Sequence, residues 1–195
     1  MNALDTLNTI IRHRRTIKPP SMDAAKPVDR ALLISLLENG TWAPTHGVTE
    51  PWRFRVYEGD SRASLAKALG DLYRATTPPN EFRDDKLIKL SENALLAPTV
   101  VVVWMQRTVG HKVPAIEELE AVACAMQNIM LSAAAVGLGS FWSSPPLIET
   151  NAFRQWLGIG AEDQCLGLLY LGWPKDGFEW PKSQRKPVES FVSWA

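Results

Sequence analysis

The segment from Ala121 to Ala135, AVACAMQNIMLSAAA, constrains the fold of this chain more than any other stretch. It lies within residues 116–139, the longest predicted helix, which a glycine-rich turn ends. The segment contains six alanines and is small and apolar on nearly every side. A helix without a polar face has to be covered all round. In a chain of 195 residues, this predicts a helix in the middle of the core or one that packs against a second subunit.

Two apolar runs predict strands that are buried on both faces. One is the β-branched run PTVVVVWM at 98–105, which follows a proline boundary, and the other is CLGLLYLGW at 165–173. Residues 52–59 alternate between apolar and polar side chains, and 140–144 predict a short strand. Further helices are predicted at 2–12, 29–40, 61–73, 81–95 and 148–158. The pattern predicts one α+β domain over residues 1–195, a three-layer α/β/α sandwich.

The charge balance argues against several classes of protein. Lys and Arg together number 21, and Asp and Glu also number 21, whereas nucleic-acid binders usually carry a basic surface. No apolar run reaches the roughly 20 residues that a membrane-spanning helix needs. The opening MNALDTLNTI carries an acidic residue and does not have the layout of a secretory signal. We therefore expect a cytoplasmic protein that binds neither nucleic acid nor a membrane.

The cysteines and histidines predict no metal or disulfide site. Cys124 and Cys165 lie in apolar surroundings without metal-ligand or redox spacing, which predicts reduced cysteines in the core. His13, His46 and His111 lie far apart in the sequence and have no acidic cluster beside them.

Common catalytic motifs are also missing from the sequence. It contains no GxxxxGK[ST] phosphate loop, no GxGxxG dinucleotide motif and no GxSxG nucleophile motif. Glu117 and Glu120 lie three residues apart on a predicted helix, where the simplest interpretation is a solvated first turn. The alternative, a glycosidase-type acid and base pair, is the weaker interpretation of the same two residues.

Positive charge is concentrated in residues 12–16, RHRRT, although the chain as a whole has a net charge of zero. A solvated helix end is one interpretation of this cluster, and a binding site for an anionic cofactor is the other. Three more segments stand apart from the regular elements: APTHGVTEPW at 43–52, GLGSFWSS at 137–144 and KSQRK at 182–186.

In this order, the four segments resemble the nitroreductase family of FMN-dependent oxidoreductases, particularly its short NAD(P)H-using members. Residues 14–16 match the family pattern R-R-S/T, and 43–52 match A-P-S/D-x-x-x-x-Q-P-W. Residues 137–142 match G-L/F-G-x-x-W, and a basic tail with Lys182 and Arg185 follows the last strand. The resemblance covers nearly the whole chain. It implies the nitroreductase-like fold, in which helices flank a mainly antiparallel sheet and a C-terminal arm crosses to a dimer partner.

The resemblance gives the basic residues a role. It implies that Arg14, Arg15 and Thr16 contact the phosphate, the ribityl chain and the flavin edge of FMN. Guanidinium groups suit a phosphate dianion because they form paired, charge-assisted hydrogen bonds. Lys182 and Arg185 in the tail are implied to complete the phosphate site.

The resemblance also implies that residues 140–143 lie along the isoalloxazine ring. Backbone N–H groups and a hydroxyl from Ser140, Phe141, Trp142 and Ser143 would hold the N5 and O4 side of the flavin. An alternative for Trp142 is simple core packing, because the chain contains eight tryptophans and they cannot all be functional.

The loop after the second helix differs from the family pattern. Trp42 and His46 are expected to bind the cofactor, with His46 donating to the flavin or closing over the substrate. The alternative for His46 is a loop histidine that faces water. Glu50 stands where relatives have Gln, so an amide donor is lost there.

For the reaction, the resemblance implies hydride transfer from NAD(P)H through flavin N5 to a nitroaromatic, a quinone or a similar small acceptor, by a ping-pong mechanism. The cofactor carries the chemistry, so no catalytic side chain is expected. A homodimer is implied, with both FMN sites at the interface. Alternatives are an FMN-binding carrier or redox sensor without turnover, and an unusual flavin reaction such as dehalogenation or flavin fragmentation. A purely structural protein would leave the basic cluster without a role.

Overall fold

A four-stranded antiparallel sheet forms the middle of the molecule in the computed structural model, which describes residues 2–108, 110 and 112–195. Its strands are β1 (Trp52–Glu58), β2 (Thr99–Met105), β3 (Gly139–Ser143) and β4 (Gln164–Gly172), in the order β1-β2-β4-β3. The central strands β2 and β4 are almost entirely buried. The two predicted buried strands are therefore confirmed, because helices cover both faces of the sheet.

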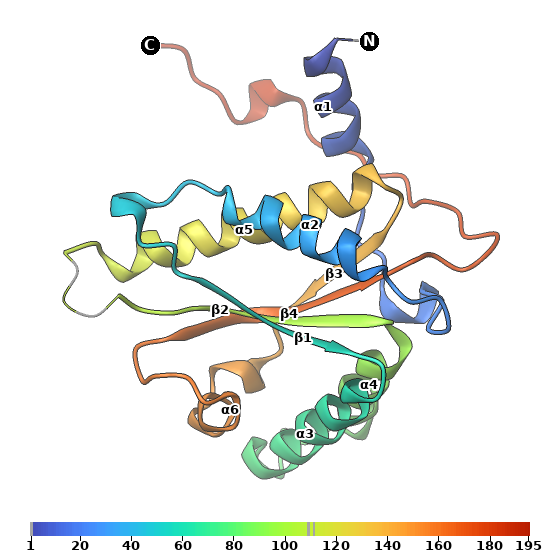
Figure 1. Cartoon of the computed structure of the whole chain (residues 1–195), viewed down its shortest axis with the longest axis vertical. Coiled ribbons are helices and arrows are strands. Elements are labelled where there is room, and N and C mark those ends of the chain that lie inside the picture. The colour runs from blue at the N-terminus through green and yellow to red at the C-terminus, as the bar shows by residue number, and fades with distance from the viewer. Residues whose placement is uncertain (1, 109, 111) are drawn as a thin grey trace.

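Helices pack on the two faces as separate layers (Figure 1). On one face lie α2 (Arg30–Thr41) and α5 (Ala115–Ala135), and on the other lie α3 (Ser61–Thr76), α4 (Asp84–Leu96) and α6 (Asn151–Leu157). Each layer encloses its own apolar cluster against the sheet. The predicted α/β/α sandwich is confirmed.

Helix α5 is the main support of the first layer. Its inner face is fully buried, and it packs so closely on α2 that a Cβ on Gly40 would lie 2.8 Å from the Ile129 side chain. Cys124 lies on the outer face and is exposed, so the prediction of a core position for it is wrong. Cys165 is partly buried in β4, and burial raises the pKa of its thiol to about 12. No helix in the described part of the chain is long and apolar enough to cross a membrane.

Two helices begin later than the sequence predicts. Helix α4 starts at Asp84 because the preceding residues pack on α3: the Tyr73 hydroxyl accepts a hydrogen bond from the Arg83 N–H at 3.0 Å, and Phe82 lies against the Tyr73 ring. The predicted helix 148–158 is divided into a 3₁₀ turn, Pro146–Glu149, and α6. The division falls at Thr150, whose hydroxyl caps α6 by accepting from Phe153 N.

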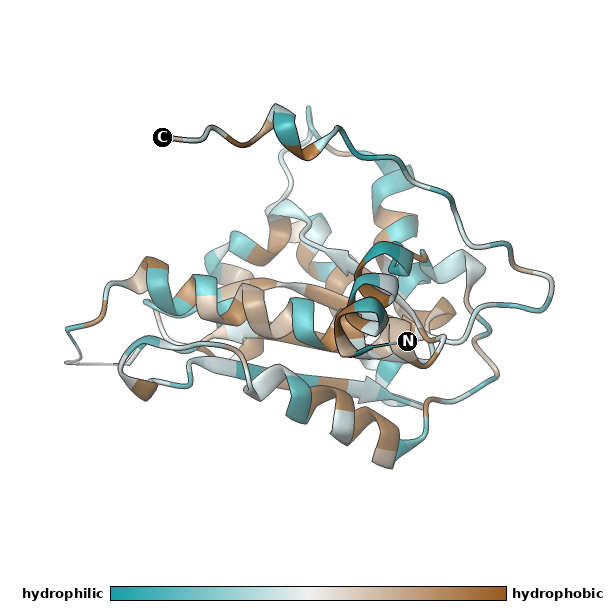
Figure 2. Cartoon of the chain, turned by 90° about the horizontal axis from the view of Figure 1, so that it is seen from above, coloured by the Kyte–Doolittle hydropathy of each residue, from teal (hydrophilic) through white to brown (hydrophobic). Residues whose placement is uncertain are grey.

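The N-terminal helix and the C-terminal tail stand outside the sandwich (Figure 1), and the tail also runs clear of it in the view from above (Figure 2). Helix α1 (Ala3–His13) begins with a capping box and contains no buried residue. Its apolar residues Leu4, Leu7 and Ile11 are 46–64% exposed. The tail from 181 onward is exposed as well, and both segments project beyond the α2 and α5 layer. Apolar surface on these two segments is therefore uncovered in a single protomer.

Candidate functional site

The basic N-terminal segment lies along the outer edge of β3. Thr16 pairs with Ser140 in a parallel bridge, and the Ile17 N–H donates to the Ser140 carbonyl at 2.9 Å. The close approach requires Gly139, because a Cβ there would lie 2.9 Å from the Ile17 Cβ. The structure thus brings together two segments, 14–16 and 140–143, which the family resemblance assigns to the same cofactor.

The tail passes the same segment. The Arg15 guanidinium donates to the Pro181 carbonyl at 2.8 Å from Nε, and to the Arg12 and Arg14 carbonyls from Nη1. The Arg14 guanidinium has no hydrogen-bond or ion-pair partner among the described residues. Lys182 follows Pro181 directly, so its backbone lies beside Arg15, and its side chain is exposed.

Arg185 lies further along the tail and bonds only within it. Its guanidinium donates to the Ser183 hydroxyl and to the Gln184 carbonyl, and the side chain is exposed. The structure therefore brings Lys182 to the basic cluster through Pro181 but shows no contact between Arg185 and that cluster.

A cavity of about 620 Å³ opens between β3 and the α3–α4 pair, and we call it the β3–α4 cavity. Phe141 and Ser143 project into it from β3, because alternate residues of a strand share a face. The Phe141 ring stacks on Tyr170 with the ring centroids 5.7 Å apart. The complete lining is Tyr73, Thr76, Thr77, Pro78, Glu81, Lys86, Lys89, Leu90, Asn93, Phe141, Ser143, Pro145, Pro146, Leu147, Thr150 and Tyr170.

The cavity combines flat apolar walls with a polar rim. Rings and prolines form the walls. Burial raises the pKa of the Tyr170 phenol and so favours its neutral form. Lys86, Lys89 and Asn93 of α4 add two cations and an amide. Sequence reasoning missed these three residues because each is an ordinary polar residue on a surface helix. Their spacing of three and four residues was the available signal, since it places them on one face.

Ser140 and Trp142 point to the opposite face of β3. The Trp142 indole N–H donates to the Leu166 carbonyl at 2.9 Å, and its ring packs against the apolar cluster under α2 and α5. Ser140 is buried on the same face. These contacts agree with the core-packing alternative for Trp142, while the expectation that it touches a cofactor stays a prediction.

His46 lies far from the β3–α4 cavity, and Trp42 follows α2, which covers the other face of the sheet. Trp42 is 81% exposed at the end of α2, and His46 Nδ1 lies 2.5 Å from Glu117 Oε2 in the first turn of α5. Ser140 follows the other end of that helix, which has 21 residues and is therefore about 30 Å long. One protomer does not bring His46 together with the basic cluster.

The His46 loop has an unusual backbone. Gly47, Val48 and Glu50 have φ values of 61°, 53° and 45°. For the two residues that are not glycine, the left-handed region costs about 1–2 kcal/mol each. The loop is held in this shape by a 3.1 Å contact between the hydroxyls of Thr45 and Thr49 and by the bond from Arg53 Nη1 to the Glu50 carbonyl. Strain of this kind is concentrated at functional loops.

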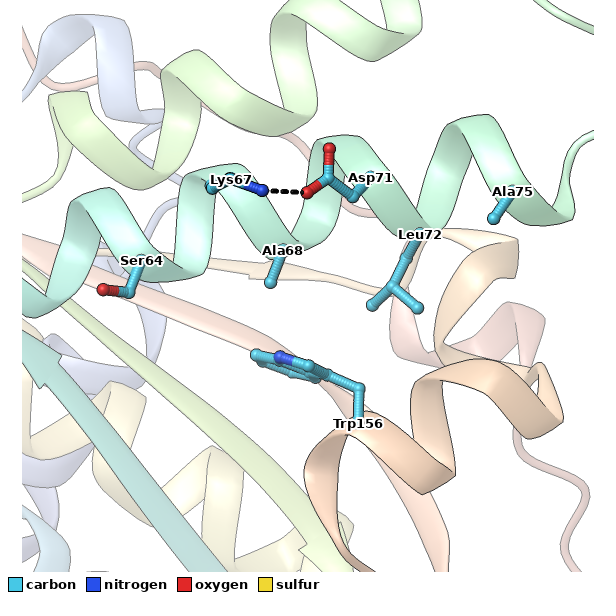
Figure 3. A pocket seen from close by; sticks show the side chains of 7 residues that line it. All are labelled: Ser64, Lys67, Ala68, Asp71, Leu72, Ala75 and Trp156. Carbon is cyan, nitrogen blue, oxygen red and sulfur yellow. Dashed lines mark hydrogen bonds and ion pairs between the residues drawn. The ribbon is translucent and has the colours of Figure 1, made fainter.

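A second hollow on the surface is lined by none of the predicted site residues. This hollow, which lies between α3 and α6 (Figure 3), is bordered by Trp156 and an ion pair between Lys67 and Asp71 at 2.6 Å. Within the described ranges, no three metal-ligating side chains of the His, Cys, Asp or Glu type come together. His111, considered above with the other histidines, lies outside the described residues.

Comparisons with known proteins agree on one family. The model of the Nitroreductase family matches residues 11–173. The curated protein named "Putative NAD(P)H nitroreductase YdjA" from Escherichia coli K12 is 33% identical over 144 residues, which are 73% of this chain and 76% of that protein.

Two solved structures share the fold. A nitroreductase-like family protein from Bacillus cereus has a TM-score of 0.82 at 28% identity, covering 100% of this chain and 98% of the other. A protein from Desulfovibrio desulfuricans in complex with FMN has a TM-score of 0.72 at 22% identity, with the same coverage.

Proposed function

The chain belongs to the nitroreductase family, and from that premise we propose that it is an FMN-dependent oxidoreductase. Electrons pass from NAD(P)H to a nitroaromatic, a quinone or a similar small acceptor. The name of the Escherichia coli relative supports the nicotinamide donor and the nitro compound. A protein of the same fold that binds FMN supports the cofactor.

The observation that carries this proposal is the bridge between Thr16 and Ser140. It puts a segment rich in arginine beside the strand whose next residue, Phe141, enters the β3–α4 cavity. A phosphate at one end of a ligand and an aromatic ring at the other would find matching groups side by side. The donor set fits FMN: the unpartnered Arg14 guanidinium, the Thr16 hydroxyl and Lys182 suit the phosphate.

The β3–α4 cavity suits the flavin ring. Its volume of about 620 Å³ is within the usual range for a ligand site. Phe141 and the prolines offer flat apolar contact, and Ser143 offers a hydroxyl toward the polar edge of the ring. Lys86 would stabilise the negative charge that accompanies flavin reduction, because a nearby cation favours an anion, whereas Lys89 is paired with Asp85 at 3.4 Å.

The chemistry explains the lack of a catalytic triad. When bound, FMN supplies the hydride acceptor and donor, and the protein supplies binding and orientation. The side chains of the cavity have to admit nicotinamide and acceptor at about 3–3.5 Å from the reacting atom. In ping-pong turnover, nicotinamide and acceptor would occupy the same place beside the flavin in turn.

A homodimer would complete the site. The exposed apolar residues of α1 and of the tail have no cover in one protomer. The whole length of α5, about 30 Å, separates His46 from the basic cluster of its own chain, so His46 would serve the site of the partner. In this arrangement the tail crosses to the partner, and Trp42 lies at the interface.

We propose that residues 1–195 form one domain, because both helical layers pack on one sheet. The two free cysteines support a cytoplasmic location.

An absorbance spectrum of the purified protein tests the proposal. We expect flavin bands that bleach on anaerobic addition of NADH or NADPH and return when a quinone or a nitroaromatic is added. Bands that persist with both nucleotides would favour an FMN-binding carrier or sensor without turnover. A protein that takes up no flavin after incubation with FMN would refute the proposed function.

A further inference from the structure

The pair formed by His46 and Glu117 joins the strained loop to α5, the longest helix in the described part of the chain. Nδ1 and Oε2 are 2.5 Å apart, and the two side chains are 62% and 40% exposed. Glu117 belongs to the first turn of α5, where the neighbouring Glu118 is buried in an ion pair with Arg107. The carboxylate of Glu117 is therefore mounted on a fixed backbone.

This contact determines the state of the imidazole ring. A carboxylate only accepts hydrogen bonds, so His46 Nδ1 must carry a proton, and this N–H donates a hydrogen bond to Glu117. Nε2 is then the free position, and it has no hydrogen-bond partner within the described part of the chain. The ring presents one defined nitrogen away from its own α5.

A favourable charge at the start of a helix would also explain an acidic residue at this position. That explanation applies equally to Glu118 and does not require any contact with the loop. The close contact with His46 and the left-handed backbone at Val48 and Glu50 are separate observations, and both concern the same loop. A site precise enough for turnover needs its side chains held by a second group.

We infer that Glu117 is a positioning residue, which fixes the tautomer and orientation of His46 so that Nε2 meets the electron acceptor bound in the partner's site. The inference rests on the proposed function. Glu117 itself does not touch the acceptor. Its effect on turnover is exerted through the imidazole.

The tautomer provides a test that does not depend on turnover. Long-range ¹H–¹⁵N correlation spectra of the flavin-loaded protein are expected to show His46 protonated at Nδ1. In Glu117→Gln the amide can either donate or accept, so the single tautomer is expected to be lost. Glu117→Asp retains an acceptor-only group and is expected to retain the tautomer. Glu120→Gln, on an exposed position two residues beyond Glu118, is the matched control.

Kinetics then link the tautomer to the reaction. Glu117→Gln is expected to lower kcat/KM for the acceptor by about tenfold, while flavin content and the rate of reduction by NAD(P)H stay at the wild-type level. His46→Asn is expected to lower the same constant at least as far. The double variant is expected to be no slower than His46→Asn, because both changes remove one interaction.

The outcomes separate the inference from the proposed function. An unchanged His46 tautomer in Glu117→Gln, or an altered tautomer with wild-type kcat/KM, would overturn the positioning role. A wild-type protein that binds FMN but is not reduced by NAD(P)H would overturn the proposed function, and with it any role of the pair in turnover. Recovery of activity in Glu117→Asp but not in Glu117→Gln would support the inference.

Discussion

Adjacent arginines of the basic cluster have different surroundings. Arg15 uses Nε and Nη1 to bind backbone carbonyls on the N-terminal segment and on the tail. Arg14 makes no such contact among the described residues, so its guanidinium is available to an anion. The distinction matters because a guanidinium that bonds to backbone carbonyls stabilises the site, whereas an unpartnered one can bind the ligand.

Replacing Arg14 therefore tests the phosphate site directly. Arg14→Ala is expected to weaken FMN binding by about thirtyfold, the equivalent of about 2 kcal/mol for a charge-assisted hydrogen bond. The fold should be unaffected because no core contact is lost. Arg12→Ala, an exposed neighbour in the same cluster, is expected to bind FMN like the wild type. Equal flavin affinity in both variants, measured by titration of the apoprotein, would contradict this assignment.

Among the elements, α5 connects the two parts of the proposed site. Its first turn holds the His46 loop through Glu117, and its last turn leads into β3. Glu118 anchors the helix start: Arg107 donates to its carboxylate and also to the Val113 carbonyl. Burial raises the pKa of Glu118, but hydrogen bonds from Arg107 and Thr108 and the positive charge of Arg107 together outweigh this, so the pKa lies below its ordinary value.

Glu118→Gln is expected to lower the free energy of unfolding by about 3 kcal/mol at neutral pH, because it breaks a buried ion pair. Because its pKa is depressed in the folded protein, the ionised Glu118 carboxylate stabilises the fold at pH values above the ordinary carboxyl pKa of 4.5. This contribution is lost as the pH falls through the folded-state pKa of Glu118. The difference between wild type and variant should therefore narrow in acid. Urea unfolding at several pH values measures it, with Glu120→Gln as a control that should remain within about 0.5 kcal/mol of wild type. A difference that does not depend on pH would exclude the ionic contribution.

At the scale of the whole molecule, one protomer exposes apolar side chains on its tail. Four apolar residues of the tail are 41–93% exposed: Val188, Phe191, Val192 and Trp194. Isolated apolar residues on a surface are common, but here they recur on two projecting segments, α1 and the tail, on the same side of the sandwich. In the proposed homodimer, we expect a second copy to bury both segments.

We expect the full chain to sediment at micromolar concentration with twice its mass of 21.7 kDa. A variant with both Phe191→Ser and Trp194→Ser should shift toward the monomer and lose flavin, since two large apolar contacts are removed. Glu189→Ser, a polar change in the same exposed segment, should remain dimeric. Analytical ultracentrifugation measures both, and a monomeric wild type at micromolar concentration would refute the dimer.

The sequence was a good guide wherever local patterns carry the information. The buried strands follow from runs of apolar residues, and the three layers follow from their alternation with helices. Element boundaries were less accurate, because the start of α4 depends on Tyr73, which lies in another helix. The burial of Cys124 was predicted incorrectly because periodicity does not say which side of a helix a sheet will cover.

By itself, the sequence determined the fold class and predicted the residue types of the proposed anion site, because helix and strand periodicity and the chemistry of arginine are local properties. Only the tertiary structure decided which of those residues meet. It joined Thr16 to Ser140 and added Lys86, Lys89 and Asn93 to the cavity. It also separated His46 from the basic cluster and from the cavity. The physical reason is that such contacts depend on how strands and helices far apart in the chain pack together, and no short stretch of sequence encodes that packing.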